Sequence, residues 1–482
     1  MFTLRDVFFA FIWIALLILA GRLIKQKVRW IQSLYLPESI VAGALALLLG
    51  PQVLGAIATS VSGEDALLAQ GLFAEPIRAV WSQSPSIFIN IVFAALFLGE
   101  SIPRPRDIWR KAAPQVIFGQ SLAWGQYVIG ILVTLIILMP LFGAHPISAA
   151  LIEIGFEGGH GTAGGMAETF GELGFEAGAD LALGLATVGI VSGIITGTTL
   201  ARWGRKRRHI SSFEAPADQP EDLPELTETE SPEIEQRRQR LMRGLLIDPL
   251  SLNFGFVGIA VIFGWLILRG LVLLEALTWG RTGFTVMEYV PLFPMALVGG
   301  ILVQLSVERL GLRALIIKPL MKNIAGMALD VVVVTALASI SLTVIGSNLA
   351  TFLILSVVGI AWNVLFFLYY APRIFPDHWF EKGIGDMGQS MGVTATGILL
   401  LRMVDPNNQS GAFESFAYKQ LFFEPIVGGG LFTAAAPALI ARLGLGPTLL
   451  ITGGLLVFWL VAGYLLMRQQ GRSSPSTQQP LL

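Results

Sequence analysis

A glycine-rich stretch, FEGGHGTAGG from Phe156 to Gly165, interrupts a chain that otherwise consists of long apolar runs. Irregular backbone leaves peptide N–H and C=O groups without helical partners, and glycine lets a ligand approach them closely. Such N–H groups can bind a carboxylate, and such carbonyls can bind Na⁺. The stretch therefore predicts the tip of a re-entrant hairpin, although an ordinary extracellular glycine-rich loop would have the same composition.

Hydroxyl and imidazole groups lie within this stretch and within a second glycine-rich segment. Thr162, Thr394 and Thr396 place hydroxyls beside flexible backbone, where they can contact a ligand. Serine and threonine inside membrane helices often bond their own helix carbonyls instead. His160 could sense pH, but hydrogen-bonded packing is the commoner role of such a residue.

Carboxylates in apolar surroundings are candidates for cation binding. Asp330 lies in the run MALDVVVV, where it could hold Na⁺ or a substrate ammonium, or form a structural pair near a helix end. Asp386 could ligate Na⁺ through hard oxygen atoms or could cap a half-helix. Gln389 and Ser390 follow closely as candidate substrate contacts. Glu157 could offset helix-end charge or attract cations.

Two amides and one arginine complete the candidate set. Gln126 and Asn363 lie in the middle of apolar runs, where they could contact substrate or form a hydrogen bond between helices. Arg402 could bind a side-chain carboxylate through two hydrogen bonds, or could extend to the membrane interface. Asn90 is a further candidate for Na⁺, because it aligns with Asp330 in the internal repeat described below.

The composition indicates the solvent that surrounds these groups. Of the 482 residues, 54% are hydrophobic and only 13% are charged, whereas soluble domains have about 25% charged residues. The chain is therefore predicted to be an all-α polytopic membrane protein. Its net charge of −1 gives no indication of nucleic-acid binding. The lack of cysteine excludes disulfides, thiolate metal sites and thiol nucleophiles, and only 4 histidines argue against zinc.

The apolar runs predict eleven membrane spans, because about 20 residues are needed to cross the hydrocarbon core. The expected spans are 7–24, 38–58, 82–100, 118–141, 181–202, 252–274, 287–307, 323–346, 350–371, 417–441 and 447–467. Two glycine-rich segments, about 147–170 and 380–402, are too polar for lipid-facing helices. They follow the fourth and the ninth span, at matching places in each half.

Charged segments divide the chain into regions. Residues 203–246 are basic at both ends, acidic and proline-rich in between, and are typical of a solvated linker. The predicted domains are a first repeat 1–202, this linker, a second repeat 247–441, an additional helix 447–467 and a disordered tail 468–482. Arginine and lysine concentrate in loops that share one side if the N-terminus lies outside. The linker and the C-terminus are then cytoplasmic.

The two halves resemble each other weakly. INIVFAALFLG in the third span matches LDVVVVTALAS in the eighth and aligns Asn90 with Asp330. LAWGQYVIG in the fourth span likewise matches IAWNVLFFL in the ninth. Because one half begins outside and the other inside, this pattern predicts two inverted-topology repeats of five transmembrane helices, each with a re-entrant hairpin.

The glycine-rich stretch also resembles a known family. Its GGHGT residues are similar to the first re-entrant loop of bacterial sodium/glutamate symporters (GltS, or ESS). LYLPESIVAG and SMGVTATG resemble two further family segments, although Ala395 stands where the family has proline. The resemblance implies a homodimer, and it implies substrate contacts by residues that match the motifs. These residues are Gly158, Gly159, His160, Gly161, Thr162, Gln126, Thr394 and Thr396.

The resemblance implies a sodium-coupled symporter for L-glutamate or a related acidic amino acid, working by alternating access in the inner (plasma) membrane. Na⁺ would be the coupling ion, and no organic cofactor is expected. Asp330, Asp386 and Asn90 are the Na⁺ candidates, and Asn363, Gln389 and Ser390 add to the substrate contacts. A carrier of another organic anion, such as a dicarboxylate, and an ion channel remain as alternatives. An enzyme is not expected, because no nucleophile or metal constellation is present.

Overall fold

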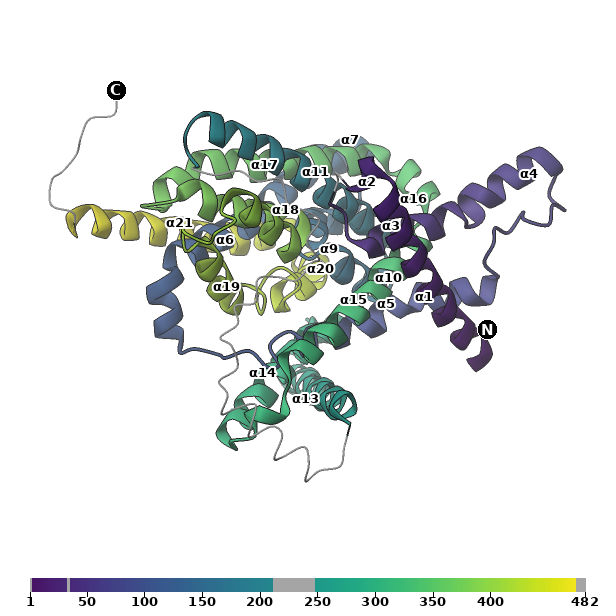
Figure 1. Ribbon diagram of the computed structural model, residues 1–482, viewed down its shortest axis with the longest axis horizontal. Helices are drawn as coiled ribbons and strands as arrows, with labels where there is room; N and C mark the ends of the chain where they lie inside the picture. The colour runs from purple at the N-terminus through teal and green to yellow at the C-terminus, as the bar shows by residue number, and fades with distance from the viewer. Residues whose placement is uncertain (1, 33–34, 211–247, 474–482) are drawn as a thin grey trace.

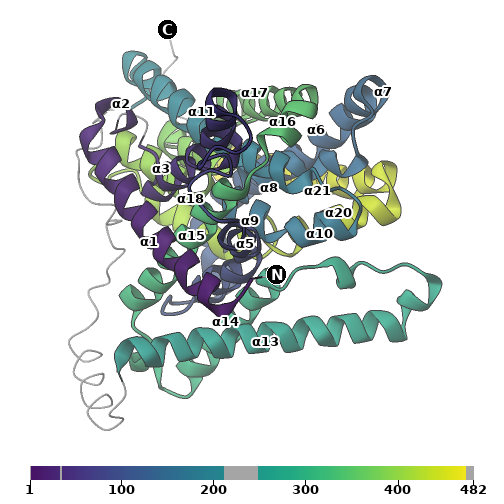
Figure 2. The same cartoon turned by 90° about the vertical axis from the view of Figure 1, so that its right-hand side faces the viewer.

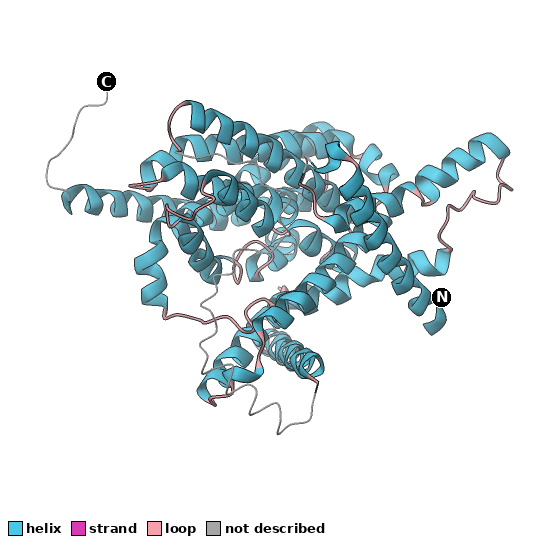
Figure 3. Cartoon of the chain, viewed as in Figure 1, coloured by secondary structure: helices cyan, strands magenta, loops and turns pink. Residues whose placement is uncertain are grey.

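The computed structural model describes residues 2–32, 35–210 and 248–473, and every regular element within these ranges is a helix (Figure 3). The predicted all-helical architecture is therefore confirmed. The first half contains α1 (Leu4–Lys27), α2 (Arg29–Gln32), α3 (Glu38–Leu48), η1 (Pro51–Gly55), α4 (Ala56–Ser62), α5 (Glu75–Ala95), α6 (Pro105–Val133), η2 (Thr134–Leu138), α7 (Met139–Phe142), η3 (Pro146–Ala150), α8 (Leu151–Phe156), α9 (Gly159–Gly165), α10 (Ala167–Glu172) and α11 (Gly178–Lys206).

The second half begins after the segment 211–247. It contains α13 (Pro249–Leu277), η4 (Trp279–Thr282), η5 (Met287–Tyr289), α14 (Phe293–Arg309), η6 (Arg313–Leu315), α15 (Lys318–Ser339), α16 (Leu342–Ser347), α17 (Leu349–Ile374), α18 (Trp379–Val404), α19 (Ala412–Phe423), α20 (Leu431–Leu443) and α21 (Leu445–Ser473). Asp248 starts this half by accepting a hydrogen bond from Ser251 N, and Pro249 occupies the first helical position.

Eight helices of the described ranges are long and apolar enough to cross a membrane, not eleven as the sequence predicts. They are Leu4–Lys27, Glu38–Ser62, Lys111–Phe142, Gly178–Lys206, Pro249–Leu277, Lys318–Ser339, Leu349–Ile374 and Leu445–Gln469. Two further predicted spans correspond to single helices that are less apolar or shorter than the eight. α5 carries several polar residues, and α14 has only 17 residues.

The predicted span 417–441 is wrong as a continuous helix. The structure divides it into α19 and α20, joined by an irregular turn that includes Gly428 and Gly429. Both glycines have positive φ, 72° and 102°, and such angles end a helix. The break brings backbone N–H groups into the protein interior, where they bind a side chain described below.

Outer and inner helices differ in how much of their apolar surface other helices cover. In the most apolar windows of α13 and α21, only 17% and 11% of residues are buried, against 61% in α11 and 56% in α15. α13 lies along the outside of the molecule, and α8 and α9 lie among other helices (Figures 1 and 2). In a membrane, the exposed apolar faces of α13 and α21 would contact lipid.

The boundaries of the charged segments differ slightly from the prediction. α11 continues to Lys206, beyond the expected boundary at 202, and α21 continues to Ser473, into the predicted tail. The predicted linker from 211 onward and the tail from 474 onward lie outside the described residues. The internal repeat with inverted topology remains a prediction.

Candidate functional site

The glycine-rich stretch forms a buried helical hairpin. α8 ends at Phe156, and α9 begins at Gly159, where a positive φ of 66° lets the chain reverse. A side chain on Gly161 or Gly164 would come within 2.8 Å of α5, which packs directly against α9. The glycines therefore serve both the turn, as the sequence predicts, and the close packing of the hairpin against α5, which the sequence analysis does not predict.

The second glycine-rich segment, α18, consists of two half-helices. Gly392 (φ −149°, ψ 42°) and Val393 (φ 57°, ψ 177°) interrupt the helix. A methyl group on Gly385 would lie 2.8 Å from Leu401 Cγ, and one on Gly388 would lie 3.0 Å from Gly397 Cα. In a straight helix residues 385 and 401 would be about 24 Å apart, so the two halves fold back on each other.

The tips of the two hairpins lie against each other. A methyl group on Gly159 would come 2.4 Å from Val393 Cγ1. The second tip also contacts α11, because a methyl group on Gly189 would lie 2.1 Å from the carbonyl oxygen of Met391. In Figure 1, α9 and α18 lie together in the centre of the molecule. Two segments more than 200 residues apart in sequence therefore form one buried region of irregular backbone.

The amides Gln126 and Asn363 meet at this region. Gln126 Nε2 donates to the carbonyl oxygen of Ser390 at 2.7 Å and to Asn363 Oδ1 at 3.2 Å. Asn363 Nδ2 donates to the same carbonyl at 3.0 Å. Both predicted amides are fully buried and bind the last turn of the first half-helix of α18. They therefore orient the second hairpin tip against α6 and α17.

Asp386 forms a buried ion pair with Lys419 on α19. The Nζ–Oδ1 distance is 3.0 Å, and the side chains are 0% and 1% exposed. Gln115 donates to the other carboxylate oxygen at 2.9 Å. Lys419 also donates to Gln389 Oε1 at 2.7 Å, and Gln420 donates to the same oxygen at 2.9 Å. The carboxylate predicted to bind Na⁺ therefore has an internal cation as its partner.

A second buried carboxylate, Glu153 on α8, accepts three hydrogen bonds. The Tyr127 hydroxyl donates to Oε2, while the Thr433 hydroxyl at 2.7 Å and Gly428 N at 2.8 Å donate to Oε1. Gly428 N is one of the backbone groups exposed by the break between α19 and α20. Three separate segments of the chain are thus joined by one carboxylate.

The other predicted hydroxyls and the histidine have separate partners. Thr394 donates to Glu424 Oε1 at 3.0 Å, and Thr396 is buried within the second hairpin. His160 is 3% exposed, and its Nε2 lies 2.9 Å from the Thr187 hydroxyl on α11. This contact favours the packing role that the sequence analysis gives as the commoner one.

The other two predicted Na⁺ ligands lie on α5 and α15. The Asn90 amide nitrogen donates to the carbonyls of Ser86 and Ile87 in its own helix. Asp330 is half-buried on α15, and Arg402 is half-buried near the end of α18. The Asn90 amide oxygen, which is the atom that could ligate a cation, is buried and has no hydrogen-bond partner among the described residues.

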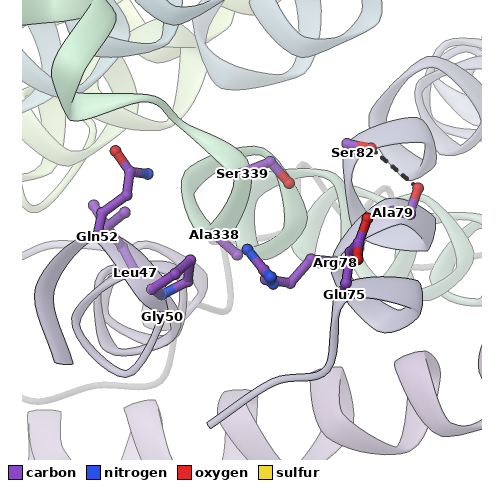
Figure 4. Close-up of a pocket in the computed structure, with 10 residues that line it drawn as sticks. Leu47, Gly50, Gln52, Glu75, Arg78, Ala79, Ser82, Ala338 and Ser339 are labelled. Carbon is purple, nitrogen blue, oxygen red and sulfur yellow. Dashed lines mark hydrogen bonds between the residues drawn. The ribbon is translucent and has the colours of Figure 1, made fainter. Parts of the chain in front are cut away.

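Two cavities lie elsewhere in the molecule. One of about 270 Å³ is lined by residues of α3, η1, α5 and α15, including Gln52, Glu75 and Arg78 (Figure 4). An apolar cavity of about 410 Å³ lies between α1, α5 and α15, with Phe11, Met327 and others in its wall. Neither is lined by residues of the hairpin tips.

The family comparison can be set against this geometry. The profile of sodium/glutamate symporters matches residues 85–404, about two thirds of the chain. The chain belongs to the sodium/glutamate symporter family. Comparison with curated protein sequences and with solved structures found no match.

The resemblance drawn from the glycine-rich motifs is therefore confirmed at the level of the symporter family. The matched residues include both hairpins, whereas α19, α20 and α21 lie beyond them. Family membership makes the chain a membrane transporter, and the family name gives sodium and glutamate as substrates.

The sequence analysis does not identify several members of this polar network, among them Glu153, Lys419, Glu424 and Tyr127. The segment FAYKQLFFEP indicates a buried charged site, because a lysine and a glutamate lie within a run rich in aromatic residues. The expectation of one continuous span at 417–441 placed Lys419 near a membrane surface, where lysine is unremarkable. Lys419 Nζ instead lies 4.0 Å from the ring centre of Phe423, inside the protein.

Proposed function

We propose that this chain is a sodium-coupled glutamate symporter that works by alternating access. The observation that carries the proposal is the contact between two hairpins with irregular tips, at Gly159 and Val393. Non-helical backbone at membrane depth is tolerated where it is buried in protein or lines a water-filled path. Paired hairpins of this kind support a substrate site between two halves of a transporter.

The charges around the tips support coupling to a cation. Three buried carboxylates lie around the tips, on Glu153, Glu157 and Asp386. A fourth, on Glu424, is half-buried and accepts a hydrogen bond from Thr394. Lys419 offsets the charge of Asp386. A substrate with two carboxylates and one ammonium would add further negative charge. Since uncompensated charge is strongly unfavourable in a buried site, the anion binds well only when a cation enters with it. Binding of Na⁺ and glutamate is then mutually dependent.

The substrate contacts that we propose come from both hairpins. The second half-helix of α18 begins at Thr394, so the partial positive charge of its N-terminus lies at the tip, where it suits a carboxylate. The proposed contacts are Gly158, Gly159, His160, Gly161, Thr162, Gln126, Asn363, Gln389, Ser390, Thr394 and Thr396.

The wider arrangement is also part of the proposal. The two hairpins are re-entrant loops that enter from opposite sides of the membrane, as expected of inverted repeats. They move as one body against the helices that join two protomers in a homodimer. The N-terminus lies outside, and the segment 203–246 and the C-terminus lie in the cytoplasm of a cell bounded by this inner membrane.

Uptake of radiolabelled L-glutamate into proteoliposomes tests the proposal. An inward Na⁺ gradient should drive accumulation that collapses when K⁺ replaces Na⁺ on both sides. Absent or Na⁺-independent uptake would contradict it. Competition by dicarboxylates that exceeds competition by acidic amino acids would reassign the substrate. Loss of counterflow, with conductance retained, would indicate a channel.

A further inference from the structure

Oxygen atoms of three side chains beside the hairpin tips are buried without a hydrogen-bond partner among the described residues. They are both carboxylate oxygens of Glu157, the hydroxyl oxygen of Thr162 and the amide oxygen of Gln126. These side chains are 2%, 0% and 1% exposed. Each of these atoms can accept a hydrogen bond or ligate a cation.

The three side chains belong to adjoining segments, and Thr162 Oγ1 faces the break between α19 and α20, 2.7 Å from a methyl group built on Gly429. Glu157 is at the turn of the first hairpin, and a methyl group on the adjacent Gly158 would lie 2.7 Å from Thr162 Cβ. Gln126 donates to the carbonyl of Ser390, and the Ser390 hydroxyl lies beside the Glu157 carboxylate, outside the geometry of a regular hydrogen bond. The oxygens thus come from α6 and from both ends of the first hairpin turn.

The neighbouring carboxylates, in contrast, have hydrogen-bond or ion-pair partners. Asp386 pairs with Lys419, Glu153 accepts three hydrogen bonds, and Glu424 accepts one from Thr394. Glu157 lies near the charges of Lys419, Glu153 and Asp386, but its oxygens accept no hydrogen bond of regular geometry from the described residues. A buried carboxylate of this kind is either protonated or bound to a cation, and the unpaired oxygens of Thr162 and Gln126 favour a cation.

We propose that Glu157, Thr162 and Gln126 form the binding site for the coupling Na⁺, an assignment that rests on the proposed function. Carboxylate, hydroxyl and amide oxygens are hard ligands that suit Na⁺. Within the described ranges, no three His, Asp or Glu side chains are close enough together to hold a metal ion. The site therefore offers one carboxylate and neutral oxygens, which matches a single positive charge better than two.

The site also explains coupling in structural terms. Na⁺ would join the first hairpin to α6, whose Gln126 already holds the second hairpin through Ser390. The ion would therefore fix the two tips relative to each other before the substrate binds. Of the ligands predicted from the sequence, Asp386 pairs with Lys419, the Asn90 amide nitrogen donates to the α5 backbone, and Asp330 lies on α15.

Thermal unfolding of the full-length protein in detergent, in NaCl against KCl, tests the assignment without substrate. Wild type should be stabilised by Na⁺ in a concentration-dependent way. Glu157→Gln should lose this stabilisation, and in KCl it should unfold at a temperature no lower than wild type, because a buried uncompensated charge has been removed. The matched control Glu172→Gln, an exposed carboxylate on α10, should respond to Na⁺ as wild type does.

Transport then separates this assignment from the proposed function. In proteoliposomes, Glu157→Asp and Thr162→Ala should raise the Na⁺ concentration for half-maximal glutamate uptake at least about ten-fold, equivalent to about 1.4 kcal/mol. Wild type without Na⁺-dependent uptake would overturn the proposed function. Na⁺-dependent wild-type uptake together with an unchanged Na⁺ requirement in these variants would overturn the site alone. Uptake driven by a proton gradient and lost in Glu157→Gln would also overturn it, by identifying a proton carrier.

Discussion

The two hairpins reverse the chain with different residues and treat their buried charge differently. The first turns at Gly159, and the second turns at Val393, a β-branched residue with positive φ. The first carries Glu157, whose oxygens accept no hydrogen bond of regular geometry from the described residues, whereas the second carries Asp386, which pairs with Lys419. A β-branched residue in a left-handed conformation is held there only by its surroundings.

This difference assigns separate tasks to two acidic residues that look alike in sequence. The ammonium group of Lys419 balances the charge of Asp386 in the second hairpin. The Glu157 oxygens of the first hairpin have no hydrogen-bond partner among the described residues, and we propose that a cation from solution binds them. Stability should therefore respond most to changes at the second hairpin, and Na⁺ dependence should respond most to changes at the first.

Removal of the internal ammonium should have the largest effect. Lys419→Met leaves Asp386 buried without its cation, and breaking such a pair costs about 3–5 kcal/mol. The unfolding temperature in detergent should fall accordingly, and Asp386→Asn in the same chain should restore part of it. Lys111→Met, which removes an exposed pair with Glu414, should leave the unfolding temperature nearly unchanged, because water screens exposed pairs. Equal losses in the two lysine variants would contradict a structural role for Asp386–Lys419.

Closing the space between the tips should have the next largest effect. Gly159→Ala forces a side chain into a left-handed conformation and against Val393 Cγ1, at about 2–4 kcal/mol in total. Val393→Ala should relieve the contact and recover part of the loss. Gly171→Ala is the control, since a methyl group there meets no atom of the described residues within 4 Å. Thermal unfolding and glutamate uptake should both separate Gly159→Ala from this control.

The amide pair should contribute a smaller and shared stabilisation. Gln126→Leu and Asn363→Leu each remove a hydrogen bond to the same carbonyl of Ser390, at about 1–2 kcal/mol. Because the two amides also bind each other, the double variant should lose less than the sum of the single losses. Additive losses in a double-mutant cycle would show that the amides act independently.

The smallest expected change in stability is at Glu172, an exposed carboxylate. Partial burial and the charges of Glu168 and Glu288 raise the pKa of Glu172 on α10. An acid with a raised pKa in the folded state binds its proton more tightly there, so its contribution favours folding at low pH and is lost as pH rises through that pKa. The unfolding temperature of Glu172→Gln should be slightly higher than that of wild type at neutral pH and equal to it at pH 4. A difference in unfolding temperature that grows as pH falls would contradict the raised pKa of Glu172.

Much of the fold and part of the site follow from local sequence properties. Glycine runs within apolar sequence predict irregular backbone, and the positive φ of Gly159 is a conformation that favours glycine. The amides Gln126 and Asn363 are recognisable because a polar group inside an apolar run needs a partner. These inferences need no knowledge of which helices are neighbours.

The charge pairing does not follow, because it depends on tertiary contacts. Nothing local distinguishes Asp386 from Glu157 until Lys419 is placed beside one of them. Lys419 in turn is hidden because its flanking residues, Phe416 and Phe423, are typical of a membrane span and not of a charged site. The break at Gly428 was likewise masked by the apolar residues on either side.

Thermodynamic reciprocity gives the most direct test of Na⁺–glutamate coupling. If the transport of the two substrates is coupled, an inward glutamate gradient must drive Na⁺ into proteoliposomes that start with equal Na⁺ concentrations inside and outside. The account predicts glutamate-dependent accumulation of radioactive Na⁺ by wild type and its loss in Glu157→Gln. Glutamate entry with no movement of Na⁺ in wild type would contradict the account.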